Sequence, residues 1–433
     1  MSPLAADTTS LRPNIPEALA GLGGGPLTEP ALREHIDPLF SRVLKRDELY
    51  LANHSLGRPL DRMADDIREA LDRWYEDMDG AWGPWMDAIG RYRELMARLI
   101  GCARPDAIVP KTSAGQGLRA ALGSLGKSKL NVVTTTGEFD SIEIVLKAWQ
   151  ARGAADVTWV PAGTDRLFRG SDVADAISPQ TDAVVVSQVI YATGQVVDGI
   201  DQVIERAHAV GAAVILDTYH AAGAMPVEFD RLGADFAIGG NYKYTRGGAG
   251  ACWLAIHPRH LRTEPHTAHV DGLFPLDTGW FAKANAFDWA RPDAPSFAEG
   301  GNGWLESTPP VLAFIQALAG LELTVGLRPD RLRAYNLEQQ AVLIDALRAK
   351  NVPVREIDDR GAFVLIPTDD LTGSLGALKA EGLNADGRPD PAEPRSQAAS
   401  DTTAGNIRLC PDILTRPHEL ARAATIVAEV LAT

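Results

Sequence analysis

The sequence predicts an α/β protein, with a large domain built on a mostly parallel seven-stranded sheet between helices and a smaller C-terminal α+β domain. Three observations predict this class. Short continuous apolar runs alternate with helical patterns between residues 107 and 254, as expected for parallel strands buried on both faces. The alternation stops after Leu254. The length of 433 residues suits two or three domains.

Two regions precede the sheet in the sequence. Residues 1–46 are rich in Pro, Gly, Ser and Thr, and predict a terminal arm with at most one short helix, mobile unless it packs on a neighbour. A short strand and turn follow at 49–57. Apolar residues then recur at helical spacing over 63–74 and again over 89–99, which predicts two helices.

Seven apolar runs supply the strands of the large domain, which we place at 47–310. They lie at 107–109, 131–134, 157–160, 183–186, 213–216, 236–238 and 251–254. Ligands of parallel sheets bind outside the carboxyl ends of the strands. Asp217 directly follows the fifth run, so the pattern places its carboxyl group at such an end.

The smaller domain is predicted at 311–433. Helical segments at 311–325 and 330–350 lead into it. Its expected elements are strands at 352–357, 362–366 and 407–409, a helix at 373–381 and a last helix from Pro417. Residues 388–405 are rich in Pro, Asp and Ser, and predict a flexible loop.

Composition excludes several classes of function. Asp and Glu outnumber Lys and Arg by 57 to 42, so no basic surplus is available for nucleic acid. No apolar run reaches the roughly 18 residues of a membrane span, and the N-terminus lacks the pattern of a signal peptide. We therefore expect a cytoplasmic protein that binds neither nucleic acid nor membrane. Cys102, Cys252 and Cys410 are too few and too scattered for a disulfide framework or a zinc site, so we expect structural thiols and no metal.

One pair of residues at the carboxyl end of the sheet has the chemistry of a cofactor site. Asp217 ends an apolar run, and Lys243 follows the next strand in a turn rich in glycine. A pyridine cofactor that acts as an electron sink needs a lysine to bond its aldehyde and a carboxylate to keep its ring nitrogen protonated. Each residue alone is more often an ordinary surface charge. Together they favour a cofactor site, because Lys243 lies between Tyr242 and Tyr244, a poor position for a solubilising charge.

Longer stretches extend this pair into a family pattern. They are Asp217-Thr-Tyr-His220 with the following Ala-Gly-Ala-Met-Pro226, and Asn241-Tyr-Lys-Tyr244 with the glycine run after it. These stretches resemble those of kynureninases, members of the fold-type I pyridoxal-phosphate enzymes, and the likeness continues over nearly the whole chain from about residue 47. The resemblance implies pyridoxal 5'-phosphate as the cofactor, with Lys243, Asp217 and His220 contacting it and Lys243 transferring protons.

The resemblance also implies the rest of the cofactor site. Residues 112–117 follow the first strand and open a helix, where backbone N–H groups and the helix dipole attract a phosphate. Such turns often serve only as helix caps, but this one matches the family's phosphate loop, so we assign Ala114, Gly115 and Gln116 to it. The other implied contacts are Phe139 stacked on the ring, Tyr191 and Thr193 lining the pocket, and Tyr242 at the phosphate and in proton transfer.

Two stretches after Leu254 resemble family segments that reach a second subunit. They are 277–282 and 306–311. In relatives, Trp280 and Thr308 would contact the phosphate of the neighbouring subunit. The resemblance therefore implies a homodimer with active sites at the interface.

The substrate side is only partly similar. Arg408 matches the family arginine that clamps the α-carboxylate of an amino acid, a task that suits a guanidinium fork, although it could be a plain surface arginine. His54, which replaces a family asparagine, Ser55 and Ser307 complete the implied substrate contacts. The divergent positions are 80–85, without the family histidine, Ile142 in place of an aspartate, Ala282-Lys283 in place of Gly-His, and Asp412-Ile-Leu414 in place of Pro-Leu-Tyr.

The leading hypothesis is a kynureninase-like hydrolase. It would cleave the Cβ–Cγ bond of L-kynurenine or a related β-acyl-alanine and release alanine. An alternative is another reaction on the same fold, by a C–S lyase or desulfurase, an epimerase or an aminotransferase, since all share the Asp217 and Lys243 pair. A third hypothesis is a catalytically silent regulator or scaffold that keeps the fold, and the intact pair argues against it.

Overall fold

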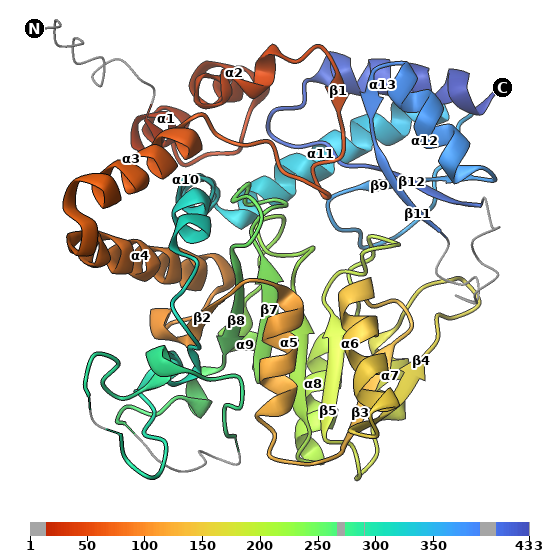
Figure 1. The fold of residues 1–433 in the computed structure, drawn as a ribbon. Helices are drawn as coiled ribbons and strands as arrows, with labels where there is room; N and C mark the ends of the chain where they lie inside the picture. Colours follow the sequence, from red (N-terminus) through yellow and green to blue (C-terminus); the bar gives the residue numbers. More distant parts are fainter. Residues whose placement is uncertain (1–13, 266–272, 290, 390–403, 433) are drawn as a thin grey trace, which may run out of the picture.

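The computed structural model describes residues 14–265, 273–289, 291–389 and 404–432. The large domain is a central sheet with helices packed against it, and the smaller domain lies across one end of that sheet (Figure 1). This is the predicted α/β architecture.

All seven predicted strands form one sheet, in the order β2-β8-β7-β6-β5-β3-β4. The strands are β2 (Ile108–Lys111), β3 (Leu130–Thr135), β4 (Ala155–Val160), β5 (Ala183–Ser187), β6 (Ala213–Asp217), β7 (Phe236–Gly240) and β8 (Cys252–Ile256). Neighbouring strands run parallel from β4 across to β7, whereas β8 is antiparallel to both β7 and β2. Asp217 ends β6, so the prediction that it lies at the carboxyl end of a strand is confirmed.

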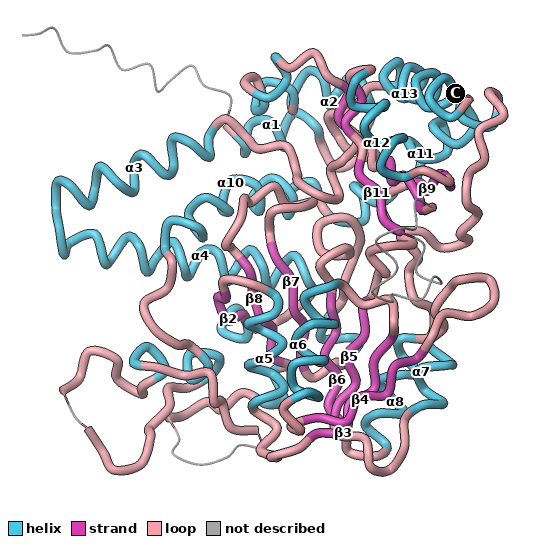
Figure 2. The backbone as a smooth tube through the Cα atoms, turned by 45° about the vertical axis from the view of Figure 1, so that its right-hand side comes forward, coloured by secondary structure: helices cyan, strands magenta, loops and turns pink. Residues whose placement is uncertain are grey.

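Helices connect and cover these strands. They are α5 (Ala114–Gly123), α6 (Asp140–Ala151), α7 (Gly170–Ala176), α8 (Ile200–Ala209) and α9 (Phe229–Leu232). The two helices predicted before the sheet are α3 (Arg62–Asp77) and α4 (Trp82–Ile100), which project together from the body of the molecule (Figure 2). Both pack on α10 (Val311–Leu327).

The smaller domain has a three-stranded antiparallel sheet of order β11-β12-β9. Its elements are β9 (Val364–Thr368), β10 (Leu383–Asn384), β11 (Asp386–Pro389), β12 (Gly405–Leu409), and the helices α11 (Pro329–Arg348), α12 (Leu371–Ala380) and α13 (Pro417–Leu431). β10 pairs in parallel with β1 (Leu49–Tyr50), which ties the start of the large domain to the smaller one.

Two predictions for this domain need correction. Residues 352–357 do not form a strand, because among the described residues one backbone hydrogen bond, from the Arg355 amide to Leu365 O, joins them to β9 in place of a ladder. Arg388 and Pro389 belong to β11 rather than to a loop, since they pair with β12. Gly405, the last residue of the predicted loop, begins β12, and residues 390–403 lie outside the described residues.

The prediction of at most one short helix in the N-terminal arm is also wrong. The arm contains α1 (Ile15–Leu22) and α2 (Glu29–His35), followed by the 3₁₀ turns η2 (Asp37–Phe40) and η3 (Val43–Lys45). Leu32 and Phe40 are buried in a cluster with Leu323 and Leu327 of α10. The described part of the arm therefore packs on its own chain, because its apolar side chains cover α10.

Taken singly, no described helix combines the length and apolar character of a membrane span. Only α10 and α11 do so as a pair, and they meet at a bend of 82°.

Candidate active site

Lys243 lies in the turn after β7, with its amine surrounded by aromatic rings. Its Nζ is 2.7 Å from His220 Nε2. The same atom lies 4.7, 5.5 and 5.8 Å from the ring centres of Tyr219, Phe139 and Tyr242. Burial lowers the pKa of Lys243, and the nearby arginines lower it further while Asp217 opposes them. A lysine held in this way is readily deprotonated and can act as a nucleophile or a base.

Asp217 provides the acid of this pair. Its Oδ1 accepts a hydrogen bond from the Tyr219 amide at 2.8 Å, and its side chain is buried. Burial raises the pKa of Asp217, whereas that hydrogen bond and the charge of Lys243 lower it. A buried carboxylate with few bonds of its own is suited to a cationic partner such as a protonated ring nitrogen.

Glycines allow the segments around the lysine to approach one another closely. The Gly57 amide donates to Tyr242 O at 2.8 Å. A Cβ atom at Gly57 would lie 2.0 Å from Lys243 O, and one at Gly240 would lie 2.1 Å from the Tyr219 hydroxyl. The turn that carries His54 and Ser55 is thereby held against the lysine loop.

The first turn of α5 presents a helix N-terminus, the kind of element that can bind an anion. Ser113 caps the helix by accepting from the Gln116 amide at 3.1 Å. The Gln116 side chain accepts from the Thr112 amide at 2.8 Å and donates to Glu306 at 2.8 Å. Helix N-termini attract phosphates through their backbone N–H groups. The assignment of Ala114, Gly115 and Gln116 to a phosphate loop fits this geometry.

The aromatic residues expected at the cofactor ring come together. Phe139 precedes α6, and its ring lies 5.1 Å from that of Tyr191 in an edge-on arrangement. Relatives have an aspartate where this chain has Ile142. Asp140 supplies an acid close to that position, because its Oδ1 is 3.4 Å from the Tyr191 hydroxyl. Thr193 is buried inside its own turn, where its hydroxyl bonds to Gln195.

The residues gathered here match the needs of pyridoxal phosphate. The cofactor needs a buried amine, a carboxylate opposite its ring nitrogen, a flat aromatic surround and a site for a phosphate dianion. Lys243, Asp217, Phe139 and the start of α5 supply these four parts. The donor set therefore fits the group.

Arg408, on β12, borders the same site. Its Nη1 donates to Tyr191 O at 2.5 Å, and its Nη2 lies 2.6 Å from Asp386 Oδ2. Arg388 holds the other oxygen of Asp386 at 2.7 Å. The sequence prediction did not include Asp386 or Arg388. They lie on β11, a short polar strand with Gly and Pro that no apolar pattern marks. Their place at the site follows from the strand register, which sets Asp386 opposite Arg408.

His54 is buried beside this group of charges. Its Nε2 is 3.6 Å from Asp386 Oδ2, and its ring lies 4.7 Å from that of Phe363. Neither ring nitrogen has a hydrogen-bond partner among the described residues. Burial and the charge of Arg408 lower the pKa of His54 to about 3, so its imidazole is neutral at neutral pH. Ser55 follows it in the turn and is half-buried.

Trp280, Ser307 and Thr308 lie on an exposed part of the chain. The segments that carry them are side by side, since the Phe281 amide donates to Glu306 O at 3.1 Å. Their contact with a bound phosphate remains a prediction.

Glu138 is a buried acid next to the site that the sequence prediction missed. Its oxygens accept from Ser187 Oγ at 2.5 Å and from Thr135 Oγ1 at 2.8 Å. Burial raises the pKa of Glu138 to about 7. Because Phe139 is the next residue, these bonds also fix the ring that faces Lys243. The signal in the sequence is an acid directly after Gly137 at a strand end.

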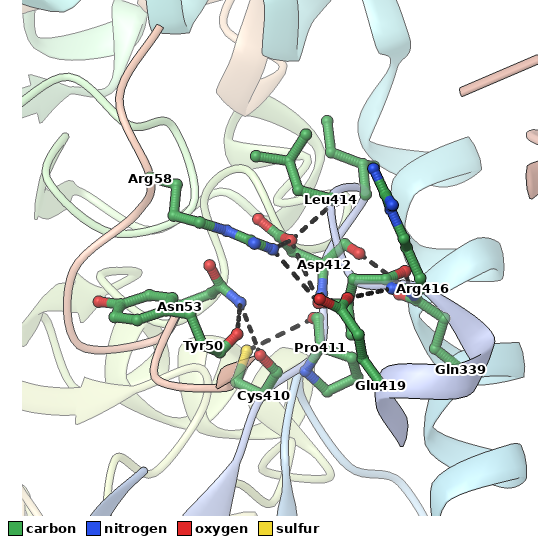
Figure 3. A network of polar contacts seen from close by, with 12 residues as sticks. Tyr50, Asn53, Arg58, Gln339, Cys410, Pro411, Asp412, Leu414, Arg416 and Glu419 are labelled. Carbon is green, nitrogen blue, oxygen red and sulfur yellow. Dashed lines mark hydrogen bonds and ion pairs between the residues drawn. The ribbon is translucent and has the colours of Figure 1, made fainter. Parts of the chain in front are cut away.

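A network of ion pairs connects the lysine loop to the smaller domain. Arg246, three residues after Lys243, lies 2.8 Å from Asp412 Oδ2. Arg58 also binds the Asp412 carboxylate, and the side-chain amide of Gln339 donates to the backbone oxygen of Asp412 at 2.9 Å (Figure 3). Asp412 therefore gives the divergent sequence after Arg408 a structural role.

The three cysteines are buried, as expected. Burial raises the pKa of Cys102, Cys252 and Cys410, so none has the character of a reactive thiolate.

Comparison with known proteins places these features in a wider group. The family model for class-V aminotransferases matches residues 81–272. A kynureninase of Xanthomonas oryzae pv. oryzae (strain MAFF 311018) is 30% identical over 305 residues, which cover 66% of this chain and 69% of that protein. The kynureninase of Pseudomonas fluorescens is 27% identical over 370 residues, covering 82% of this chain and 84% of that protein.

Solved structures share the fold. The cystine C-S lyase C-DES, in complex with cysteine persulfide, has a TM-score of 0.76 at 18% identity, and the match covers 88% of this chain and 98% of that one. The cysteine desulfurase of Thermococcus onnurineus NA1 has a TM-score of 0.74 at 18% identity, covering 90% and 96%. At this identity the likeness concerns the fold alone.

Proposed function

Since the chain belongs to the kynureninase family of fold-type I, pyridoxal-phosphate-dependent enzymes, we propose that it hydrolyses the Cβ–Cγ bond of L-kynurenine or a related β-acyl-alanine. Water adds its hydroxyl group to the acyl carbon and its hydrogen to Cβ. The products are a carboxylic acid and alanine. The observation that carries the proposal is that Asp217 and Arg408 both act electrostatically on the buried Lys243, in a chain whose curated relatives are kynureninases.

The residues of this site have distinct roles in that reaction. Pyridoxal phosphate, when bound, supplies an electron sink for the bonds around the substrate Cα. The Lys243 amine holds the cofactor and moves a proton at the substrate Cα. The Asp217 carboxylate keeps the ring nitrogen protonated. Arg408 binds the substrate α-carboxylate, for which a guanidinium offers two parallel donors.

Burial supports this assignment of protons. The neutral imidazole of His220 lies between the Lys243 amine and the Tyr244 hydroxyl, with its Nδ1 at 3.1 Å from that hydroxyl. Burial and the charge of Lys243 lower the pKa of His220. A neutral imidazole can accept from a lysine ammonium or donate to its free amine, so it suits both states of the base.

The alternatives are distinguished by their products. A desulfurase that carries sulfur on its own cysteine is disfavoured, because Cys102, Cys252 and Cys410 are buried. A C–S lyase without such a cysteine, an epimerase and an aminotransferase would each use the same Lys243 and Asp217. Only the hydrolase yields alanine together with an acid from the side chain.

The proposal is tested by incubating the holoenzyme with L-kynurenine and 3-hydroxy-L-kynurenine, and in parallel with L-cystine. We expect the two kynurenines to give alanine and the fluorescent anthranilate product, and L-cystine to give none. Sulfide or pyruvate from L-cystine, without alanine from the kynurenines, would favour the lyase.

We also propose a homodimer with active sites at the interface, in which Trp280 and Thr308 contact the phosphate of the neighbouring subunit. Their exposure in a single chain supports this. A mass of about twice 46.4 kDa in solution is expected, and Thr308→Ala should weaken cofactor retention. A monomer that retains the cofactor would contradict the proposal.

A further inference from the structure

Asp386 lies between two arginines at the edge of the site. Its Cα is paired with that of Arg408 across the β11-β12 ladder. Its Oδ2 is 2.6 Å from Arg408 Nη2, and its Oδ1 is 2.7 Å from Arg388 Nη1. The Arg408 side chain is only 2% exposed, whereas those of Asp386 and Arg388 are 15% and 34% exposed. The chain thus supplies a carboxylate of its own to the arginine that binds the substrate carboxylate.

Asp386 does not saturate Arg408. A guanidinium has five N–H donors, and the contacts with Tyr191 and Asp386 use two of them. Within the described part of the chain, Arg408 Nε is buried without a hydrogen-bond partner. A buried donor without a partner is costly, so this atom is a binding position for an acceptor. Arg408 therefore has N–H donors left for one more carboxylate in addition to Asp386.

The charges of the group permit one incoming carboxylate. Arg388 and Arg408 together carry two positive charges, and Asp386 cancels one. A single α-carboxylate makes the group neutral. A second carboxylate on the substrate side chain would leave an excess negative charge beside Arg408, whose side chain is buried, and charge is costly there. The three charged residues also act on Lys243, because Arg388 and Arg408 lower the pKa of its amine and Asp386 raises it.

We propose that Asp386 is a specificity-determining residue that restricts the site to amino acids with one carboxylate and an uncharged side chain. The inference rests on the proposed role of Arg408 and goes beyond it, because it names the class of substrate. Asp386 acts by using one of the two positive charges that would otherwise attract a dicarboxylic amino acid. An acyl-alanine with an aromatic ketone belongs to the accepted class.

The test compares ligands that differ only in charge. Dissociation constants of L-asparagine and L-aspartate, and of L-glutamine and L-glutamate, are measured with the holoenzyme from the change in cofactor absorption, at fixed pH and ionic strength. The wild-type protein is expected to bind each amide about tenfold more tightly than its acid, or better. In Asp386→Asn, the ratio should move toward the acids by about tenfold. Because each ratio is taken within one protein, loss of folded material cancels.

Two further variants complete the test. Asp386→Glu keeps the charge and should keep the wild-type ratio. Asp369→Asn removes an exposed acid just after β9 in the same sheet and should also leave the ratio unchanged. The inference is overturned if Asp386→Asn leaves the ratio unchanged, if it weakens all four ligands equally, or if Asp369→Asn shifts the ratio as much. Failure to hydrolyse kynurenines would overturn the proposed reaction but would not alter these binding ratios.

Discussion

The Nζ atom of Lys243 lies 2.7 Å from Nε2 of His220, and both side chains are buried at the carboxyl end of the sheet. The lysine amine therefore has a fixed polar neighbour in addition to the rings around it. Since burial lowers the pKa values of both groups, the pair holds fewer protons at neutral pH than a solvent-exposed lysine and histidine would. This is the state that a nucleophilic amine requires.

Replacing Lys243 is expected to abolish both the bond to the cofactor and the reaction. Lys243→Ala should lose the absorption band of the lysine-bound cofactor, and activity should fall by about a thousandfold or more, because a covalent anchor and a base are lost together. The exposed Lys350→Ala serves as a control and should change neither. A Lys243→Ala protein that keeps the wild-type band would show that another lysine binds the cofactor.

Replacing Arg408 should mainly affect substrate binding. Arg408→Lys retains a charge but loses the fork, so the KM for an amino acid should rise by about ten- to a hundredfold, equivalent to about 1.4 to 2.8 kcal/mol. The cofactor absorption should be unchanged. The assignment of Arg408 to the carboxylate would be wrong if KM stayed constant while kcat alone fell.

Glu138 makes folding stability depend on pH. Its pKa is raised by burial from 4.5 to about 7 in the folded state. The folded protein therefore binds more protons than the unfolded chain between these values, and stability declines as the pH rises from 4.5 to 7. Glu138→Gln removes this term. Relative to the wild type, the variant should gain about 2 to 3 kcal/mol in unfolding free energy between pH 5 and pH 8.

Urea unfolding of both proteins at the two pH values measures this difference. Any constant loss from the altered bonds to Ser187 and Thr135 cancels in the comparison. A difference between the proteins that does not change with pH would mean that Glu138 titrates normally.

Asp412 should be important for stability. Its side chain is 10% exposed and pairs with Arg58 and Arg246, whose side chains are 10% and 6% exposed. Asp412→Asn leaves two buried guanidinium groups without a counter-charge, which should cost about 3 to 5 kcal/mol. Asp369→Asn provides the matched exposed control. Equal urea midpoints for the two variants would contradict the role of the network in Figure 3.

The sheet could be predicted from the sequence because its strands are continuous apolar runs. The apolar run 213–216 needs burial on both faces, so the sequence predicts a buried strand that ends at the acid Asp217. The grouping of Lys243 with Asp217 follows from parallel topology, since β6 and β7 are neighbours. The order of the strands along the chain therefore implies that the two side chains lie near each other, and their charges do interact.

The helices of the arm and strand β11 were not predicted, because neither has a long periodic pattern of apolar residues. The arm forms α1 and α2 because Asn14 caps one helix and proline stands at the start of both, which suits a first helical turn. β11 is polar and carries Gly387 and Pro389, so no apolar alternation marks it. Asp386 acquires its importance from the register with Arg408, which no local pattern encodes.

The measurement that most directly tests the central claim follows the oxygen of water. L-kynurenine is incubated with the holoenzyme in water labelled with ¹⁸O, and both products are quantified by mass spectrometry. The account predicts equal amounts of alanine and anthranilate, with labelled oxygen in the new carboxyl group of anthranilate, and no products with Lys243→Ala. A change in cofactor absorption without alanine or anthranilate would contradict hydrolysis of this substrate.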